Sequence, residues 1–236
     1  MQLFITSHLQ KKGNQIILKD VPELLSQIRK VLRGKIWDTI AVQNREWTIV
    51  RYTLEIIDWT DKDLVGDIVK EEVLVLPSKK VVLLIALPNK WDKAELIVQK
   101  LTEIGVNEII FRPAERSVIT QWNEKKAERL LKIAQEATEQ SRGIQIPSLS
   151  FSKDIISLVK EKKVYVFDKW GMNIIKENEE NTIFSEKELY GVVWPEGGLT
   201  KKDYQILEKY EVLELGENIL RMETAAIVGG WILRNS

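Results

Sequence analysis

Three short segments near the carboxyl end of the sequence combine glycine with charged residues in a way that suits ligand binding. They are residues 194–198 (Trp-Pro-Glu-Gly-Gly), 215–221 (Leu-Gly-Glu-Asn-Ile-Leu-Arg) and 222–225 (Met-Glu-Thr-Ala). Each is predicted to follow a strand or to open a helix. Glycine lets a ligand approach the backbone closely, and the start of a helix offers free N–H groups to polar ligand atoms. The pattern indicates a small-molecule site, although tight turns without a ligand would use the same glycines.

The composition excludes several other kinds of site. The chain has 236 residues with no cysteine, so disulfides, thiolate nucleophiles and cysteine-ligated zinc are ruled out. The one histidine, His8, lies in a predicted strand and turn that do not suit a catalytic triad. Neither GxxxxGKS/T nor GxGxxG occurs, which argues against the common ATP and dinucleotide sites. The aspartates at residues 58–67 lack the glycine spacing of a calcium loop, and no metal is expected.

Charge and hydropathy limit the choice of partners. Lys plus Arg and Asp plus Glu number 35 each, so no net charge draws the whole protein to RNA or to anionic lipid. Locally, residues 1–35 carry seven basic and two acidic side chains, whereas residues 36–78 carry four basic and nine acidic. The basic part suits an RNA backbone, and a solvated surface equally well. The lack of cysteine, of a long apolar span and of secretion-signal features predicts a cytoplasmic location without a membrane partner.

The elements that must position these segments form two predicted domains, residues 1–76 and 77–236. The first is predicted to be a small β-barrel because β-branched runs alternate with polar turns. Those runs are residues 38–43, 47–57 and 64–69. A helix is expected from Pro22 to Gly34, flanking or plugging the barrel. Its apolar stripe is Leu24, Leu25, Ile28, Val31 and Leu32.

The second domain is predicted to be α/β because strands and helices alternate after a proline-containing boundary at residues 76–80. Residues 81–87 form a continuous apolar run, typical of a strand buried on both faces. The helix at residues 125–140 is expected to turn Leu131 inward. The full series comprises strands at 81–87, 108–111, 164–167, 189–194 and 212–215, and helices at 92–104, 125–140, 153–160, 201–210 and from about 223. Ligands bind at strand carboxyl ends in open α/β sheets, where the glycine-bearing segments fall.

Several blocks of this half occur in the order typical of a known family. They are residues 90–95 (KWDKAE), 99–106 (QKLTEIGV), 115–117 (ERS), 136–142 (EATEQSR) with Pro147, 195–198 (PEGG), 215–216 (LG), 219–221 (ILR) and 223–225 (ETA). Over residues 80–236 the chain resembles the ribosomal RNA small subunit methyltransferase E family. These SPOUT-class enzymes transfer a methyl group from S-adenosylmethionine to N3 of a uridine in 16S ribosomal RNA. Residues 1–76 match more loosely, through residues 29–33 (RKVLR) before a β-rich region.

The resemblance implies a fold, a cofactor and roles for particular residues. Residues 77–236 would be a trefoil-knotted α/β domain, residues 1–76 a PUA-like RNA-binding β-barrel, and the protein a homodimer. Methyl transfer from a sulfonium needs no metal, but the proton on uracil N3 must leave. Arg221 is the candidate for holding the resulting anion, and Glu196 is the candidate general base. S-adenosylmethionine would be held by Gly197, Gly198, Leu215, Gly216, Ile219, Leu220 and Thr224.

RNA phosphates are expected to contact basic side chains of both domains, for which surface solvation is the simpler alternative. The candidates are Arg29, Lys30, Arg33, Arg112, Arg116 and Arg142. Trp91 and Trp194 are candidates to stack on an extruded uridine, although packing in the core also explains them. The small residues of the last helix suit either a subunit contact or internal packing.

Two positions depart from the family pattern. Trp194 stands where the family usually has glycine, and Gln27 and Ile28 stand where it often has histidines. The indole is expected to reshape the pocket or narrow its entrance. The alternative hypothesis is therefore a catalytically degenerate ribosome-assembly factor that binds rRNA without methylating it. A third hypothesis is a SPOUT enzyme that acts on transfer RNA or on ribose.

Overall fold

The computed structural model describes residues 1–114, 116, 119, 121–173, 184–198, 200–201, 205 and 209–236. The chain forms two compact units. The first comprises Met1–Leu76 with Glu139–Ile144, and the second comprises Pro77–Thr138 with Gln145–Ser236. Glu115 and Ser117, quoted above for the family resemblance, and most of the helix expected at 201–210 lie outside the described residues.

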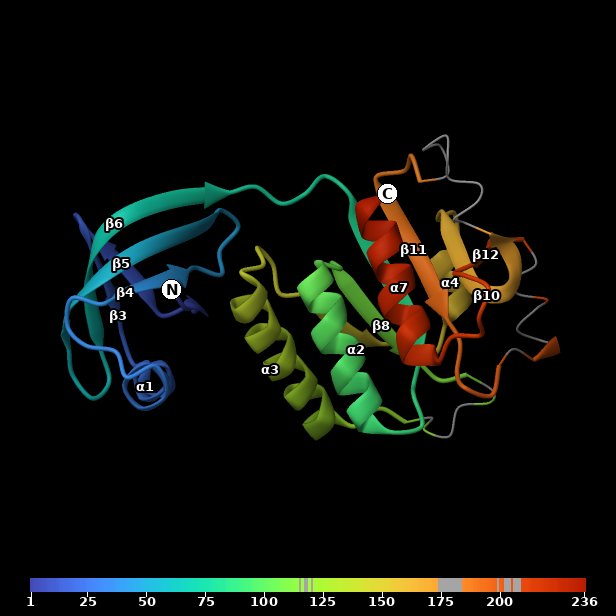
Figure 1. Ribbon diagram of the computed structural model, residues 1–236, viewed down its shortest axis with the longest axis horizontal. Coiled ribbons are helices and arrows are strands. Elements are labelled where there is room, and N and C mark those ends of the chain that lie inside the picture. Colours follow the sequence, from blue (N-terminus) through green and yellow to red (C-terminus); the bar gives the residue numbers. More distant parts are fainter. Residues whose placement is uncertain are drawn as a thin grey trace. The chain divides into compact units, whose positions relative to one another are not determined.

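The first unit is a six-stranded sheet with a short helical segment packed against it (Figure 1). The strands are β1 Leu3–Ile5, β2 Leu9–Lys12, β3 Gln15–Leu18, β4 Thr39–Gln43, β5 Ile49–Trp59 and β6 Leu64–Leu74. Their order is β1-β4-β5-β6-β3-β2, with only β1 and β4 parallel. Tyr52, Leu54 and Ile56 alternate along β5 and enter the core on one face. The pairings leave β1 and β2 as edges, so closure into a barrel stays a prediction.

The helix expected at residues 22–34 is shorter and changes its winding. Helix α1, Pro22–Ser26, continues as the π-helical turn η1, Gln27–Val31, and Leu32 N donates to Gln27 O at 3.1 Å, five residues back. Leu25 and Ile28 are buried as expected. The wider turn carries the following residues off the apolar stripe. Val31, 71% exposed, and Leu32 lie on the surface, so their predicted burial is wrong.

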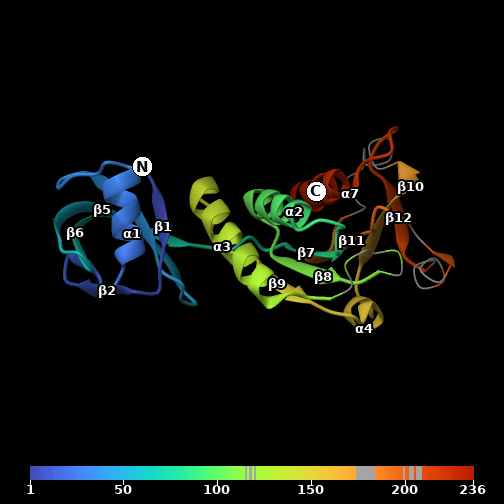
Figure 2. The same cartoon turned by 90° about the horizontal axis from the view of Figure 1, so that it is seen from below.

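The second unit is an α/β domain, as predicted, on a six-stranded sheet whose pairs are all parallel. The strands, in spatial order, are β12 Glu211–Glu214, β10 Val164–Asn173, β11 Glu188–Val193, β7 Lys80–Ala86, β8 Glu108–Arg112 and β9 Ser148–Phe151. The helices are α2 Trp91–Ile104, α3 Glu124–Ser141, α4 Ile155–Val159 and α7 Met222–Asn235. Figure 2 shows the sheet between α2 and α7 on one face and α4 on the other.

Strand β7 is buried on both faces, as its apolar run predicts. Val81, Leu83 and Ile85 join the core cluster beneath α2 and α7. Val82 and Leu84 point the opposite way and join the cluster that contains residues of α4. Alternate side chains of one strand therefore hold both helical layers on the sheet.

Three details of the second unit differ from the sequence prediction. Leu131 of α3 is exposed, and Ile133 packs against the core instead, so the expected inward position of Leu131 is wrong. Strand β9 is an edge strand of sequence Ser-Leu-Ser-Phe, too short and polar to be recognised from β-propensity. Helix α4 covers only five residues. Within the described residues, none of the helices has the length and apolar character that a bilayer span requires.

Helix α7 lies close to the sheet because two of its residues lack side chains. A Cβ atom on Gly229 would stand 2.3 Å from Phe167 Cε2, and one on Gly230 would stand 2.6 Å from Leu101 Cδ2. Both distances are far below van der Waals contact. These glycines therefore serve internal packing, one of the two uses that the sequence left open.

The close approach of α7 predicts an unusual result for Gly229→Ala. Alanine normally stabilises a helix interior relative to glycine by about 1 kcal/mol. Here the added methyl group overlaps the Phe167 ring, so we expect a net loss of about 1–3 kcal/mol in the free energy of unfolding. Urea denaturation of the full chain measures it. A gain in stability would contradict the rigid contact between α7 and β10.

Candidate functional site

A cavity of about 440 Å³ lies at the carboxyl ends of β11 and β12, beside residues 167–169 in the middle of β10. β11 and β12 both pair with β10 in a parallel sheet, so the segments that follow β11 and β12 lie at one edge. Pro195 follows β11, Leu215 follows β12, and Met222 opens α7, and all three line the cavity. The three segments singled out in the sequence thus surround one space.

Most residues predicted to hold a cofactor line this cavity. They are Gly198, Leu215, Gly216, Ile219 and Leu220, and the two predicted catalytic residues, Glu196 and Arg221, line it as well. Gly197 and Thr224 are not among the lining residues. Gly197 faces Arg116 instead, whose Nη1 donates to the Gly197 carbonyl at 2.7 Å. Thr224 is exposed on the first turn of α7.

Two glycines give the cavity wall its backbone shape. Gly198 has φ +71° and its N–H donates to Pro195 O at 2.9 Å, which closes a tight turn. Gly216 has φ +144°, and no atom lies within 4 Å of the position that a Cβ would take. Both φ values disfavour other residues. The open space beside Gly216 leaves the backbone accessible to a ligand.

The charges around the cavity are mostly paired. Lys93 Nζ donates to Glu196 Oε1 at 2.6 Å and lies 3.6 Å from Glu223 Oε2. On the other wall, Lys169 pairs with Glu214 and also donates to Gly216 O at 3.2 Å. Each lysine thus ties a loop to a neighbouring strand or helix. Within the described residues, no group of three or more His, Asp or Glu side chains is placed to hold a metal ion.

The Glu196 carboxylate is kept ionised by its surroundings. Partial burial alone would raise its pKa. The hydrogen bond from Lys93 and those from backbone N–H groups outweigh burial, and the pKa of Glu196 lies below the ordinary glutamate value. An ionised carboxylate can accept a proton, but a lowered pKa makes it a weak base.

Arg221 is the cation of the cavity that has no partner in the described structure. It lies immediately before α7, with extended backbone, and its side chain is exposed. Neither a hydrogen bond nor an ion pair engages its guanidinium among the described residues. It is therefore available to an anionic or carbonyl oxygen of a ligand.

Trp194 lines the cavity and is largely buried. The residue is 7% exposed and belongs to the hydrophobic cluster on the α4 face. The Arg112 guanidinium lies 4.4 Å from its ring centroid, and Arg112 itself is 4% exposed. Trp194 is among the residues that line the cavity, so its effect on the shape of the pocket and of its entrance stays a prediction. Arg112, predicted to grip RNA phosphates, is instead a buried cation stacked on this indole.

The other predicted RNA-binding residues have varied surroundings. Lys30 and Arg33 are exposed beside η1. Arg116 is exposed and bonded to Gly197, as described above. Arg142 lies in the part of the chain that belongs to the first unit, and its Nη2 donates to Met1 O at 2.8 Å. Trp91, a stacking candidate, is partly buried with its ring centroid 5.9 Å from that of Trp122.

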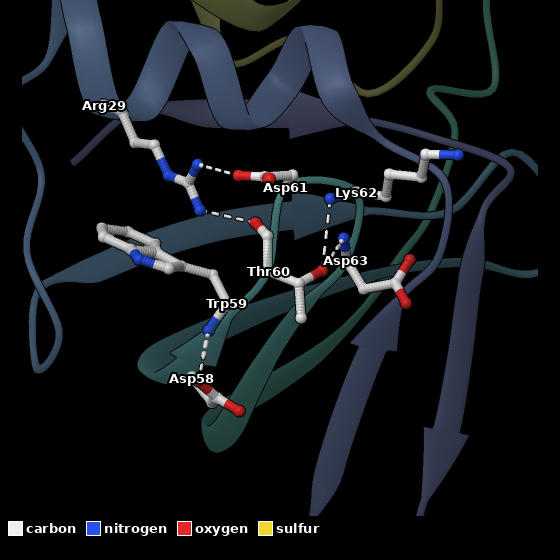
Figure 3. Close-up of polar contacts among 7 residues, drawn as sticks. All are labelled: Arg29, Asp58, Trp59, Thr60, Asp61, Lys62 and Asp63. Carbon is white, nitrogen blue, oxygen red and sulfur yellow. Dashed lines mark hydrogen bonds and ion pairs between the residues drawn. The ribbon is translucent and has the colours of Figure 1, made fainter.

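Arg29 is held by the turn between β5 and β6 (Figure 3). Its Nη1 lies 3.3 Å from Asp61 Oδ1, and its Nη2 donates to Thr60 O at 2.5 Å. The guanidinium also stacks on Trp59 at 5.1 Å from the ring centroid. These contacts of Arg29 join η1 to the hairpin. An RNA phosphate would have to compete with them for the guanidinium.

Sequence reasoning missed several residues of the cavity. Asp168 and Lys169 directly follow the predicted strand 164–167, so the rule that located the glycine segments applied to them as well. Lys93 lies on α2, which follows the neighbouring strand β7. Its pairing with Glu196 depends on the order β11-β7, which no local pattern reveals.

A parallel α/β sheet with a ligand-sized cavity at its strand ends defines the class of the second unit as an α/β ligand-binding domain. Residues 76–233 match the family described as "RNA methyltransferase domain". The match covers more than half of the chain, so the protein belongs to this RNA methyltransferase family. The resemblance found in the sequence is confirmed.

Curated relatives carry the name that the sequence motifs suggest. A protein named "Ribosomal RNA small subunit methyltransferase E" from Rickettsia conorii is 28% identical over 96% of this chain and 91% of its own length. A protein of the same name from Bacillus subtilis is 34% identical over 58% of this chain and 59% of its own length.

Solved structures share the fold over the whole chain. A methyltransferase of Legionella pneumophila, described in complex with bound SAM, aligns with TM-score 0.81 at 22% identity and covers 99% of this chain and 96% of that one. A ribosomal RNA small subunit methyltransferase E of Neisseria gonorrhoeae, also described with S-adenosylmethionine, gives 0.79 at 18% identity, covering 100% and 97%. At such identities the likeness establishes the fold.

The charge pairing predicts a change in proton affinity when Lys93 is removed. Burial raises the pKa of Glu196, and the hydrogen bond from Lys93 opposes this effect. Lys93→Met removes that hydrogen bond, so the pKa of Glu196 should rise. Carboxyl-carbon NMR titration measures this shift, with Glu196→Gln assigning the resonance. Lys169→Met, which frees Glu214 on the opposite wall, is the matched control and should leave Glu196 unchanged. An unchanged Glu196 titration in Lys93→Met would show that this ion pair does not form in solution.

Proposed function

We propose that this protein methylates N3 of a uridine in 16S ribosomal RNA with S-adenosylmethionine as methyl donor. One observation carries the proposal: the cavity at the ends of β11 and β12 lies within the RNA methyltransferase domain. The names of the curated relatives support the rRNA substrate. The two related structures described with S-adenosylmethionine support the donor.

The cavity fits this cofactor in size and in chemistry. A volume of about 440 Å³ falls within the range of about 300–1,000 Å³ that small-molecule pockets occupy. Gly198 and Gly216 allow close approach to the backbone, as a nucleoside requires. Asp168 offers a carboxylate to the amino group of the cofactor's methionine portion. We assign Gly198, Leu215, Gly216, Ile219 and Leu220 to the cofactor, with Gly197 and Thr224 as supports of the same loops.

The protein residues must position the uracil and handle its proton. S-adenosylmethionine, when bound, supplies an activated methyl group. Glu196 accepts the N3 proton, and Arg221 stabilises the imide anion that remains. Because the pKa of Glu196 is lowered, Glu196 is a weak base, and Arg221 must supply most of the driving force for deprotonation. Arg221 is therefore the residue on which the rate should depend most.

The remaining features of the proposal concern fold, assembly and location. We propose that the second unit carries the trefoil knot of SPOUT enzymes and that the first unit is PUA-like and binds RNA. The contact residues would be Lys30, Arg33, Arg116 and Arg142, with Arg29 in a supporting position. The active form would be a cytoplasmic homodimer without a membrane partner. The alternative that Trp194 suggested, a degenerate assembly factor, differs from the enzyme in its ability to bind and use S-adenosylmethionine.

The proposal predicts separate effects on binding and on chemistry. The wild-type protein should bind S-adenosylmethionine in calorimetry and restore 3-methyluridine to 16S rRNA from a strain that lacks the gene. Arg221→Ala should keep cofactor binding but lower the methylation rate by about 10²–10³-fold, because an anion-stabilising donor is lost. Glu196→Gln should have the smaller effect of the two. Mass spectrometry of nucleosides measures the product.

Two controls make this experiment decisive. Arg129→Ala removes an exposed arginine of the same unit that lies outside the cavity, and it should methylate at the wild-type rate. Arg221→Lys keeps the charge without the planar fork and should recover part of the activity. Wild-type methylation by Arg221→Ala would refute the role of Arg221. Failure of the wild-type protein to bind S-adenosylmethionine would refute the enzymatic function and leave the assembly factor.

A further inference from the structure

An exposed apolar and basic surface begins in the π-helical turn of the first unit and continues beyond it. Its members, called here the Trp37 patch, are Lys30, Val31, Leu32, Arg33, Lys35 and Trp37. The indole is 67% exposed and Val31 is 71% exposed. Large apolar side chains are usually withdrawn from water, so a cluster of them among cations indicates a binding surface. Lysine and arginine accompany an exposed aromatic ring here, as in nucleic-acid-binding surfaces.

Trp37 occupies a backbone conformation that normally belongs to glycine. Asp38 N donates to Lys35 O at 3.1 Å, which closes a four-residue turn with Trp37 in its third position. Trp37 has φ +77°, as this position of a type II turn demands. A bulky side chain is strained there. Glycine would relieve the strain, so an indole at this position indicates a use other than folding.

The turn that carries Trp37 is firmly anchored. Trp37 N donates to Ile56 O at 2.7 Å, and Ile56 N donates to Asp38 O at 3.0 Å. The Asp38 carboxylate accepts from Lys35 N at 2.7 Å. These bonds join the turn to β5, so the ring is displayed from a fixed backbone. A ligand that stacks on it would not have to order the loop first.

The charge of the patch selects the class of ligand. Lys30, Arg33 and Lys35 are exposed, and none of their side chains is ion-paired within the described part of the chain. Asp38 is the neighbouring acid, and it is engaged with the turn backbone. The adjacent η1 is a π-helical turn, a feature frequent at functional sites. Three exposed cations within seven residues of an exposed indole suit phosphates on either side of a stacked base.

We propose that the Trp37 patch binds an unpaired nucleotide of RNA, with the base stacked on the Trp37 indole and flanking phosphates on Lys30, Arg33 and Lys35. The RNA class of the ligand rests on the proposed function. The nucleotide must be unpaired because a base within a duplex does not offer its face to a side chain. The patch thus selects single-stranded segments such as loops and bulges.

Trp37→Gly separates this role from a structural one. The substitution removes the indole and relieves the positive φ, so the melting temperature should stay constant or rise. Affinity for a short fluorescent oligouridylate, measured by anisotropy with the full chain, should fall at least about tenfold, because the stacking of one base is lost. Trp37→Phe should recover most of the affinity. Binding of an RNA duplex should change little.

Trp47 provides the matched control. It is a fully exposed tryptophan of the same unit, beyond the opposite end of β4 from Trp37, and Trp47→Gly should leave oligouridylate affinity unchanged. Equal affinities of the wild type and Trp37→Gly, or no binding of oligouridylate by the wild type, would overturn the proposal. An altered oligomeric state of Trp37→Gly in sedimentation, with RNA affinity unchanged, would identify a protein contact instead and also overturn it.

The outcome is independent of the methyltransferase test. If the wild type does not bind S-adenosylmethionine but Trp37→Gly weakens oligouridylate binding, the proposed role of the Trp37 patch stands and the proposed enzymatic function is refuted. If the wild type methylates rRNA but Trp37→Gly binds oligouridylate as tightly as the wild type, the enzymatic function stands and the role of the patch is refuted.

Discussion

The parallel pairing of β10, β11 and β12 is the constraint on which the second unit depends. Parallel strands end at the same edge, so the segments after β11 and β12, which are distant in the sequence, meet there beside β10. The cavity, its two glycine turns and the first turn of α7 all follow from this pairing. Helix α7 can start at the cavity and lie along the sheet because Gly229 lets it rest directly on Phe167.

Much of the fold could be predicted because it is encoded locally. The apolar run of β7 and the stripe of α2, which ends at Gly105 with φ +87°, are patterns of neighbouring residues. The strand order could not be predicted in this way. β11 lies between β10 and β7, and β12 lies beyond β10, an arrangement that depends on distant contacts. The exposure of Val31 also escaped prediction, since helical periodicity assumes uniform winding and η1 breaks it.

The candidate site could likewise be predicted where it depends on local sequence, but not where it depends on distant contacts. Glycines at predicted strand ends identified the walls formed by Gly198 and Gly216, because φ preference is a property of the single residue. Partners joined through space remained hidden, above all the bond between Lys93 and Glu196. The prediction that Arg112 contacts RNA phosphates rested on residue type alone and was wrong, because this arginine is buried against Trp194. A sequence thus indicates where a cavity forms more readily than how its charges are paired.

The π-helical turn has a consequence for how the surface of the first unit can arise. A π-turn closes its hydrogen bond over five residues where an α-turn uses four, so it is equivalent to an α-helix that has gained one residue. All side chains beyond it are rotated without any change in their identity. A one-codon insertion or deletion in a gene could therefore move Val31 and Leu32 between core and solvent. Related proteins that differ in length by one residue here would present different surfaces with nearly the same sequence.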